Sequence, residues 1–187
     1  MKSLLTFCAS FLAVVTSTAA AAEPGITYDC DTAANHFSEL VLPAPAGRFT
    51  VSGAVQLNAL AAVSKYAPLA HVWISSASQP GQSPASYAGV SVLALPADAE
   101  KNPTGSPAIQ VISFNANGKE DEMLPLTMLA KPGGPQPFSL TFDGRTVAAS
   151  IASEHRTFTV DAPAPVVRLV CSTGEFLFTD VKIQASQ

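Results

Sequence analysis

The sequence predicts an all-β protein: a two-sheet antiparallel β-sandwich with little helix and one disulfide. Short runs rich in Val, Ile, Thr and Phe alternate with clusters of Pro, Gly, Ser and Asn. No stretch repeats its apolar residues at the helical period. About ten such runs fit into about 165 residues, which favours a sandwich over a small barrel. Two cysteines remain once an export signal is removed.

The first 22 residues have the three parts of a cleavable secretory signal peptide. Lys2 supplies a positive charge, Leu4 to Val15 form an uncharged and mostly apolar run, and small residues end at Ala22. The run is well short of the ~20 residues that a membrane-spanning helix needs. Lipid attachment at Cys8 is disfavoured because this cysteine lies inside the apolar run. We expect cleavage near Ala22 and a single secreted or periplasmic domain over 23–187.

Charge and composition limit the kinds of partner that we expect the mature chain to bind. Nine Lys and Arg residues and all fourteen acidic residues follow residue 22, so this part carries a formal charge of −5. A mildly acidic surface without a basic cluster argues against nucleic acid and anionic membranes as partners. The mature part also shows no membrane span, and the alanine-rich composition is typical of bacterial proteins.

Cleavage would remove Cys8 and leave Cys30 and Cys171. An even pair in an oxidising compartment is most simply a disulfide. A reactive thiol or a pair of metal ligands is the alternative, but no Cys-x-x-Cys spacing supports it. The bridge would close nearly the whole domain into one loop, so we expect reduction to lower the free energy of unfolding by about 5 kcal/mol.

Alternation of apolar and polar residues predicts the strands. In Gly47–Leu57, the clearest case, Phe49, Val51, Val55 and Leu57 share one face, so one face is buried and the other meets water. The predicted strands are 37–42, 47–57, 69–75, 87–95, 108–114, 123–129, 138–142, 146–151, 156–160, 166–171 and 176–183.

Turn residues separate these strands. Asp143-Gly144 between two alternating runs predicts a hairpin, because both residues tolerate the positive φ of tight turns. Ala54–Lys65 is ambiguous and could begin a short helical turn. The loops 76–86 and 97–107 are long and turn-rich, and long loops on a sandwich often carry binding sites.

Two C-terminal motifs resemble a known superfamily. The hairpin Phe138–Gly144 and the last strand Gly174–Ile183 are similar to those of concanavalin A-like lectins and glucanases, including laminin G-like domains. The resemblance implies a jelly-roll sandwich whose closing strand returns beside the N-terminal one. A bridge between Cys30 and Cys171 needs the same adjacency. Members of the superfamily bind glycans, cleave them, or do neither, so the resemblance implies a fold and leaves function open.

No catalytic residues can be named. Retaining glycosidases of the superfamily carry an alternating Glu-x-Asp-x-x-Glu strand, whereas Glu120-Asp121-Glu122 has adjacent acids that fall in a turn. Jelly-roll lyases carry a Gln-x-His strand, and here Gln110 is followed by valine and isoleucine. The histidines His36, His71 and His155 are scattered without zinc spacing. We expect no catalytic residues and no obligatory cofactor.

Calcium is a weaker possibility. Asp29 and Asp31 flank Cys30 and would point the same way if this segment is extended. Carboxylate pairs with backbone carbonyls are the usual ligands of this cation. Two aspartates alone predict a calcium site only weakly.

The strongest candidate for a ligand site is the run Leu69–Ser75. Ala70, Val72 and Ile74 form an apolar face, which leaves His71, Trp73 and Ser75 together on the other. An indole beside an imidazole on an outward face could stack on a pyranose ring. Because tryptophan is usually well buried, we favour the other interpretation, that it packs into the core with His71 at its edge.

Three functions follow in order of preference. The first is a glycan-binding module that uses Trp73, His71, Tyr66 and Tyr87. The second is a structural or protein-interaction component of the cell envelope or surface. A polysaccharide-active enzyme comes third, because no acid/base pair can be named.

Overall fold

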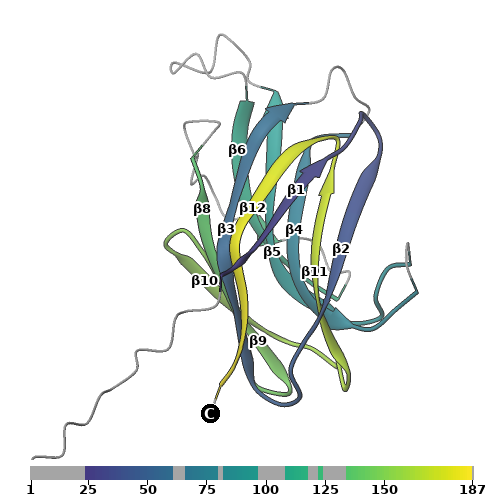
Figure 1. Cartoon of the computed structure of the whole chain (residues 1–187), viewed down its shortest axis with the longest axis vertical. Coiled ribbons are helices and arrows are strands. Elements are labelled where there is room, and N and C mark those ends of the chain that lie inside the picture. The colour runs from purple at the N-terminus through teal and green to yellow at the C-terminus, as the bar shows by residue number, and fades with distance from the viewer. Residues whose placement is uncertain are drawn as a thin grey trace, which may run out of the picture.

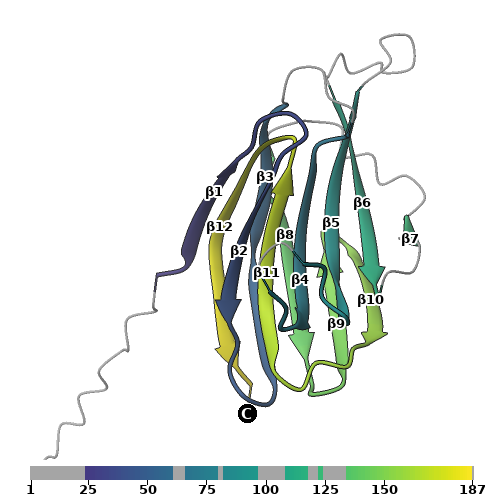
Figure 2. The same cartoon turned by 90° about the vertical axis from the view of Figure 1, so that its right-hand side faces the viewer.

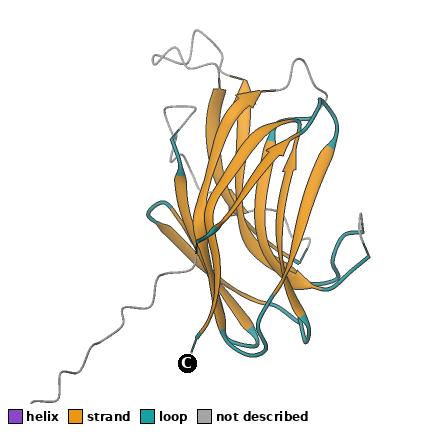
Figure 3. Ribbon diagram, viewed as in Figure 1, coloured by secondary structure: helices purple, strands orange, loops and turns teal. Residues whose placement is uncertain are grey.

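The computed structural model describes residues 24–60, 66–79, 82–96, 108–117, 122–123 and 134–186. Two six-stranded sheets, antiparallel throughout, pack face to face. Figures 1 and 2 show the two layers from perpendicular directions. The described residues form strands and loops without a helix (Figure 3). The predicted two-sheet sandwich is therefore confirmed.

The first sheet has the order β1-β12-β3-β8-β9-β10. It joins both ends of the domain, because the last strand lies between the first strand and the third. Its strands are β1 (Ile26–Asp31), β12 (Gly174–Ala185), β3 (Phe49–Leu60), β8 (Gln136–Phe142), β9 (Thr146–Ile151) and β10 (Glu154–Thr159).

The second sheet has the order β2-β11-β4-β5-β6-β7. Its long central strand β4 pairs with β11 on one side and β5 on the other. Its strands are β2 (Phe37–Pro43), β11 (Pro165–Ser172), β4 (Leu69–Ser76), β5 (Tyr87–Pro96), β6 (Ala108–Ala116) and β7 (Glu122–Met123).

The structure differs from the strand predictions mainly near the N-terminus. Strand β1 was not predicted, because only Cys30 of its six residues is buried and an edge strand of this kind shows no alternation. Strand β3 stays extended to Leu60, so the possible helical turn does not begin at Ala54. The predicted signal peptide over 1–22, the predicted loop 97–107 and residues 124–129 of a predicted strand lie outside the described residues.

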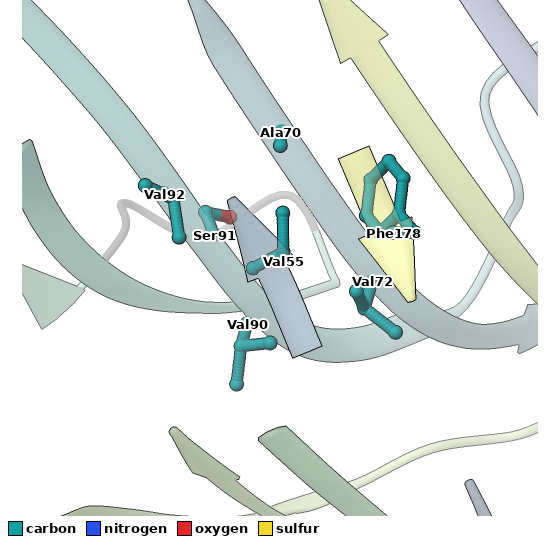
Figure 4. Close-up of a pocket in the computed structure, with 7 residues that line it drawn as sticks. All are labelled: Val55, Ala70, Val72, Val90, Ser91, Val92 and Phe178. Carbon is teal, nitrogen blue, oxygen red and sulfur yellow. The ribbon is translucent and has the colours of Figure 1, made fainter. Parts of the chain in front are cut away.

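The core fills the space between the sheets. Phe49, Phe176 and Phe178 from the first sheet meet Val72 and Ile74 from the second, all with side chains almost fully buried. A small cavity lies in this core between Val55 and Phe178 on one side and β4 and β5 on the other (Figure 4). It is too narrow to admit a water molecule, so it is a packing gap and not a ligand site.

The predicted disulfide is confirmed. Cys30 of β1 and Cys171 of β11 are bonded, with Cα atoms 6.1 Å apart, and both side chains are buried. Because β1 and β11 belong to different sheets, the bridge ties the two layers together at one edge of the sandwich. It links residues 141 positions apart, so it constrains most of the unfolded chain.

Two crossovers between the sheets stack at this edge. The β1–β2 and β11–β12 connections exchange hydrogen bonds through Thr32 Oγ1, which donates to Gly174 O at 2.9 Å and accepts from Gly174 N at 3.2 Å. Thr173 sits between the two strands with a positive φ of 59° and donates its N–H to His36 O. These bonds satisfy buried polar groups where the chain leaves one sheet for the other.

The predicted hairpin joins β8 and β9. Gly144 has a φ of 102°, as a tight turn requires. The Asp143 carboxylate accepts bonds from the backbone N–H of Arg145 and Thr146 and from the Thr146 hydroxyl. The hydroxyl bond and these two backbone bonds lower the pKa of Asp143 to about 2. Over the residues that the structure describes, no helix has the length and apolarity to cross a membrane.

Candidate functional site

The outward face of the second sheet carries large side chains in cross-strand register. On β4, Ala70, Val72 and Ile74 are buried in the core, so His71 and Trp73 point outward, as the alternation predicted. The favoured prediction, a tryptophan packed in the core, is wrong, because Trp73 is half-buried on the opposite face.

Trp73 lies across the neighbouring strand. Its register partner on β5 is Gly89, and a Cβ atom at Gly89 would come within 2.9 Å of Trp73 Cδ1 and 1.9 Å of Val72 O. The indole Nε1 reaches past β5 and donates to Asn115 Oδ1 of β6 at 2.7 Å. The absence of a side chain at Gly89 is what permits this close approach.

Two rings hold the indole. The imidazole of His71 stacks on it with centroids 4.3 Å apart and planes 30° apart, and the Tyr87 phenol lies 4.7 Å away at 34°. Along β4 the register places His71 on one side of Trp73 and Tyr87 on the other. Both faces of the indole are therefore in contact with aromatic rings, and an edge of the indole is what the site can offer to a ligand.

A buried hydrogen-bond network lies beneath the rings. His71 Nδ1 is 2.5 Å from Ser91 Oγ, and Asn115 Nδ2 donates to Ser91 Oγ at 2.9 Å. Ser91 and Asn115 are only 1% and 4% exposed. Burial lowers the pKa of His71 from 6.5 to about 3, so its imidazole is neutral at ordinary pH.

A serine beside a histidine is also the start of a nucleophilic site. Two observations favour a positioning role here. The Ser91 hydroxyl is buried beneath the rings, and an imidazole with so low a pKa is a weak base. The network instead fixes the imidazole and the indole, since Asn115 bonds to both Ser91 and Trp73.

Arg168 of β11 is a second buried, hydrogen-bonded side chain on this face. Its side chain is 1% exposed, and each of its three nitrogens donates to a different residue. Nε donates to Ser75 Oγ at 3.0 Å, Nη2 donates to Ser78 Oγ at 2.6 Å, and Nη1 forms an ion pair with Glu39 Oε1. The arginine thus joins β2, β4 and the loop after β4.

The Ser78 contact orders the loop between β4 and β5. Ser78 Oγ donates to Gln82 O at 2.9 Å, and Ser76 N donates to Ser86 O at 2.8 Å across the base of the loop. Pro84 is buried against the sheet. This is one of the two long loops that the sequence singled out for binding.

A groove of about 230 Å³ opens beside this loop. Glu39 and Val170 are a cross-strand pair on β2 and β11, and Phe37 stands at the start of β2. Trp73 contributes from β4. The lining residues are Phe37, Glu39, Trp73, Gln82, Ser83, Pro84 and Val170. The volume is below the roughly 300 Å³ at which pockets for drug-sized ligands begin, so the groove suits a single ring-sized group.

The structure brings together three of the four predicted ligand-binding residues. His71, Trp73 and Tyr87 form one ring cluster. Tyr66 is 56% exposed and precedes β4, with six residues between it and Trp73 in the chain, so it lies outside the cluster. Whether any of the four binds a ligand stays a prediction.

The weak calcium prediction is also untested. Asp29 and Asp31 are exposed on β1, and Asp31 faces Glu175 of β12 in register. Across the described residues, no three His, Cys, Asp or Glu side chains gather in a way that could hold a metal ion. Gln110, the glutamine of the incomplete lyase motif, is 0% exposed and lies in register with the buried Ala94, so it faces the core.

Sequence reasoning missed the residues that shape the groove. Phe37 and Glu39 share a face of β2 with Val41, and this mixed face gave no sign of its use. Phe37 is 62% exposed, which is unusual for an aromatic side chain at the start of a strand. Arg168 interrupts the apolar run of β11, and a charge inside a buried strand is the feature that could have marked it.

Comparison with protein-family models and with curated proteins finds no match. Among solved structures, an alginate lyase from Alteromonas sp. 272 has a TM-score of 0.52 and 8% identity, covering 86% of this chain and 88% of that chain. Scytalido-glutamic peptidase has a TM-score of 0.51 and 10% identity, covering 82% of each chain. The carbohydrate-binding module CBM66 from Bacillus subtilis reaches 0.44 at 9% identity, over 84% of this chain and 86% of its own.

Identities this low show the fold alone. The two structures with TM-scores above 0.5 show that this chain shares an overall fold with proteins of known structure. Two neighbours of nearly equal similarity act on unrelated substrates, as their names state, so the function must be argued from the groove itself.

Proposed function

We propose that this chain is an exported, non-catalytic carbohydrate-binding domain whose ligand sits in the groove beside Phe37, Glu39 and Trp73. One observation carries the proposal: on a face built from a fixed polar network, an exposed aromatic ring, a carboxylate and a polar loop converge on a space of about 230 Å³. Binding sites for small polar ligands combine an apolar wall with a few placed polar groups in this way.

The groove residues have complementary tasks in this proposal. The exposed ring of Phe37 offers an apolar surface for the C–H face of a sugar, and the edge of Trp73 bounds the same space. Sugar hydroxyls are both donors and acceptors, so they pair with the Glu39 carboxylate and with the side chains of Gln82 and Ser83. His71 and Tyr87 hold the indole and do not themselves contact the sugar.

Export agrees with the chemistry of the domain. The inter-sheet disulfide is of the kind that persists in oxidising compartments, which supports a secreted or periplasmic location. Cleavage near Ala22 is the matching proposal for the N-terminus. N-terminal sequencing of the protein purified from culture medium or periplasm tests it, and a protein that retains Lys2 would contradict it.

Retention on immobilised polysaccharides tests the site. Phe37→Ala is expected to weaken binding by at least tenfold, about 1.4 kcal/mol, because it removes the exposed apolar wall. Since Phe37 is 62% exposed, its loss should leave the fold intact, which the melting temperature checks. Tyr66→Ala removes an aromatic that is almost as exposed but outside the groove, so it is the matched control. Equal retention of the wild-type protein and Phe37→Ala would contradict the proposed site.

A protein-docking role is the second candidate, and one observation favours it. Phe37 and Val41 are 62% and 44% exposed on β2, which is an edge strand of its sheet. Exposed apolar residues along a sheet edge are typical of strand-mediated contacts between proteins. Val41 does not line the groove, so Val41→Lys separates the two functions. Loss of a specific envelope partner in Val41→Lys, with no glycan bound by the wild type, would favour docking.

A further inference from the structure

The charges around the groove indicate which sugars it can hold. On the outward faces of β2, β11, β4 and β5, the ionisable side chains of the described residues are Glu39, Arg168, His71 and Tyr87. The loop 76–86 contains no Lys, Arg, Asp or Glu at all. Among the described residues of these faces, recognition of an acidic ligand would therefore depend on Arg168 or His71.

Arg168 is not available to an acidic ligand. Its guanidinium recognises carboxylates best when two N–H groups point at the ligand in a fork. Here Nε, Nη1 and Nη2 each donate to a protein oxygen, on Ser75, Glu39 and Ser78. The side chain is 1% exposed and is not among the residues that line the groove.

His71, the other side chain that could carry a positive charge, is also unavailable to an acidic ligand. The imidazole of His71 stacks on Trp73 and contacts Ser91, and it does not line the groove. Its lowered pKa of about 3 keeps it uncharged in ordinary conditions. The group that does face the groove with a charge is the Glu39 carboxylate, which is 14% exposed.

Glu39 is held as an acceptor. Its Oε1 accepts from Arg168 Nη1, which fixes the carboxylate, and no donor among the described residues contacts Oε2. A carboxylate accepts hydrogen bonds from sugar hydroxyls. It also repels a second carboxylate at short range, an effect that the Arg168 charge on Oε1 offsets only in part.

We propose that the groove selects neutral sugars and rejects uronic acids, because Glu39 faces the ligand while Arg168 is sealed beneath the loop. This inference rests on the proposed carbohydrate-binding function and adds the class of its ligand. The ligand is a hexose or N-acetylhexosamine unit of a neutral glycan, with hydroxyls that donate to Glu39.

The experiment compares matched neutral and acidic glycans with the full mature protein. The probes are gluco-, manno-, galacto- and N-acetylglucosamine oligosaccharides, together with alginate and oligogalacturonate. For each neutral oligosaccharide with a free C6 hydroxyl that binds, the same oligosaccharide oxidised at C6 to the uronate is measured beside it. At low salt we expect the oxidised form to bind at least about tenfold more weakly. Added salt should narrow the gap, because screening weakens the repulsion.

Two variants locate the discrimination. Glu39→Gln keeps the shape and removes the charge, so binding of the uronates should rise relative to the neutral sugars. Because this change leaves Arg168 buried without its counter-charge, the salt titration of the wild-type protein provides a measurement that does not depend on the variant folding. Glu175→Gln alters a carboxylate on the other sheet, bonded to Asn58, and should leave the ratio unchanged.

The outcomes separate this inference from the proposed function. Uronates bound as tightly as their neutral partners, or alginate bound more tightly than any neutral probe, would overturn the selectivity and leave glycan binding in place. No retention on any glycan would overturn both. Neutral binding that Phe37→Ala leaves unchanged would show that the sugar sits elsewhere, and would overturn the assignment to this groove.

Discussion

On both sheets every second side chain points outward, but the two outward faces differ in the size and burial of those side chains. On the first sheet, the cross-strand pairs are made of small hydroxyl residues: Thr50 faces Thr141, and Ser52 faces Ser139, which faces Ser150. On the second sheet, a corresponding cross-strand pair is Trp73 and Arg168. These small residues of the first face are half-buried, whereas the second face has a polar network under aromatic rings.

This difference shows which face of the sandwich buries polar groups at a cost in stability. Burying polar groups such as Ser91, Asn115 and Arg168 is unfavourable unless each finds a partner. A face that only had to be soluble could have used the small hydroxyl residues of the first sheet. The second face instead holds a hydrogen-bonded network that fixes the indole of Trp73 and contacts Ser78 in the loop after β4. We infer that this rigidity serves the groove, since a preorganised site loses less entropy on binding.

The largest contrast should come from the ion pair on each face. Arg168→Ala leaves Glu39 partly buried without its partner and removes the anchor of Ser78, so we expect a loss of about 3–5 kcal/mol in the free energy of unfolding. Lys182→Ala on the first sheet breaks an exposed pair with Asp180 and should cost about 0–1 kcal/mol. Urea unfolding of both variants measures the contrast. Similar losses for the two would refute the view that only the second face is built on buried contacts.

Gly89→Ala tests how closely the indole lies on the sheet. The added Cβ would fall 1.9 Å from Val72 O and 2.9 Å from Trp73 Cδ1, so both the backbone and the indole must move. We expect a loss of about 2–3 kcal/mol, in the range of overpacked sites. Trp73 is the only tryptophan of the chain, so its emission should shift to longer wavelength as the ring becomes more hydrated.

Ser52→Ala on the first face is the matched control for Gly89→Ala. It changes a small outward residue on a central strand and should alter neither stability nor emission by a measurable amount. A normal tryptophan spectrum in Gly89→Ala, at wild-type stability, would mean that the indole does not depend on this close approach.

Acid should lower the free energy of unfolding through His71, a buried residue of the second face. The pKa of His71 is about 3 in the folded protein and 6.5 in the unfolded chain, because burial disfavours the charged imidazole. Between these values only the unfolded chain binds the proton, so stability falls as the pH falls. The slope approaches about 1.4 kcal/mol per pH unit in the middle of this window.

Replacing the histidine isolates this effect. His71→Gln should flatten the pH dependence of urea unfolding between about pH 6.5 and pH 4, whereas His155→Gln, an exposed histidine on the first face, should keep the wild-type slope. Contributions from Asp143, whose pKa is lowered to about 2, are common to both variants and cancel. Equal slopes in all three proteins would contradict a buried neutral His71.

The sequence could predict the layers of this fold better than the groove. Alternation along β3, β4 and β8 is local, because a strand with one buried face repeats every second residue. The same rule placed Trp73 outward, whereas the usual burial of tryptophan wrongly favoured the core. Gly89 inside β5 is a local signal that could have marked the close approach, although its partner could not be read from the sequence.

The groove depends on pairings that no local pattern encodes. Arg168 is 129 residues from Glu39 and 93 from Ser75, and these residues meet only because β11 lies between β2 and β4. Strand β1 escaped prediction because an edge strand buries little. The disulfide was predictable for a different reason, since removal of the predicted signal peptide would leave a single pair of cysteines.

The smallest expected effect lies on the first face and completes the comparison. Thr50 Oγ1 and Thr141 Oγ1 are 3.1 Å apart across β3 and β8, a side-chain pair between half-buried residues. Thr141→Ala removes this bond and a methyl group, and cross-strand pairs of this kind contribute about 0.2–1 kcal/mol. Water can replace the lost partner at this partly hydrated position, so the lower end of that range applies. Asn115→Ala also removes a single side-chain partner, but it takes that partner from the half-buried Trp73 Nε1 and from the buried Ser91 Oγ, so it should cost about 1–3 kcal/mol. If urea unfolding gives the two variants equal losses, the two faces differ in side-chain size and not in how far their polar groups are removed from water.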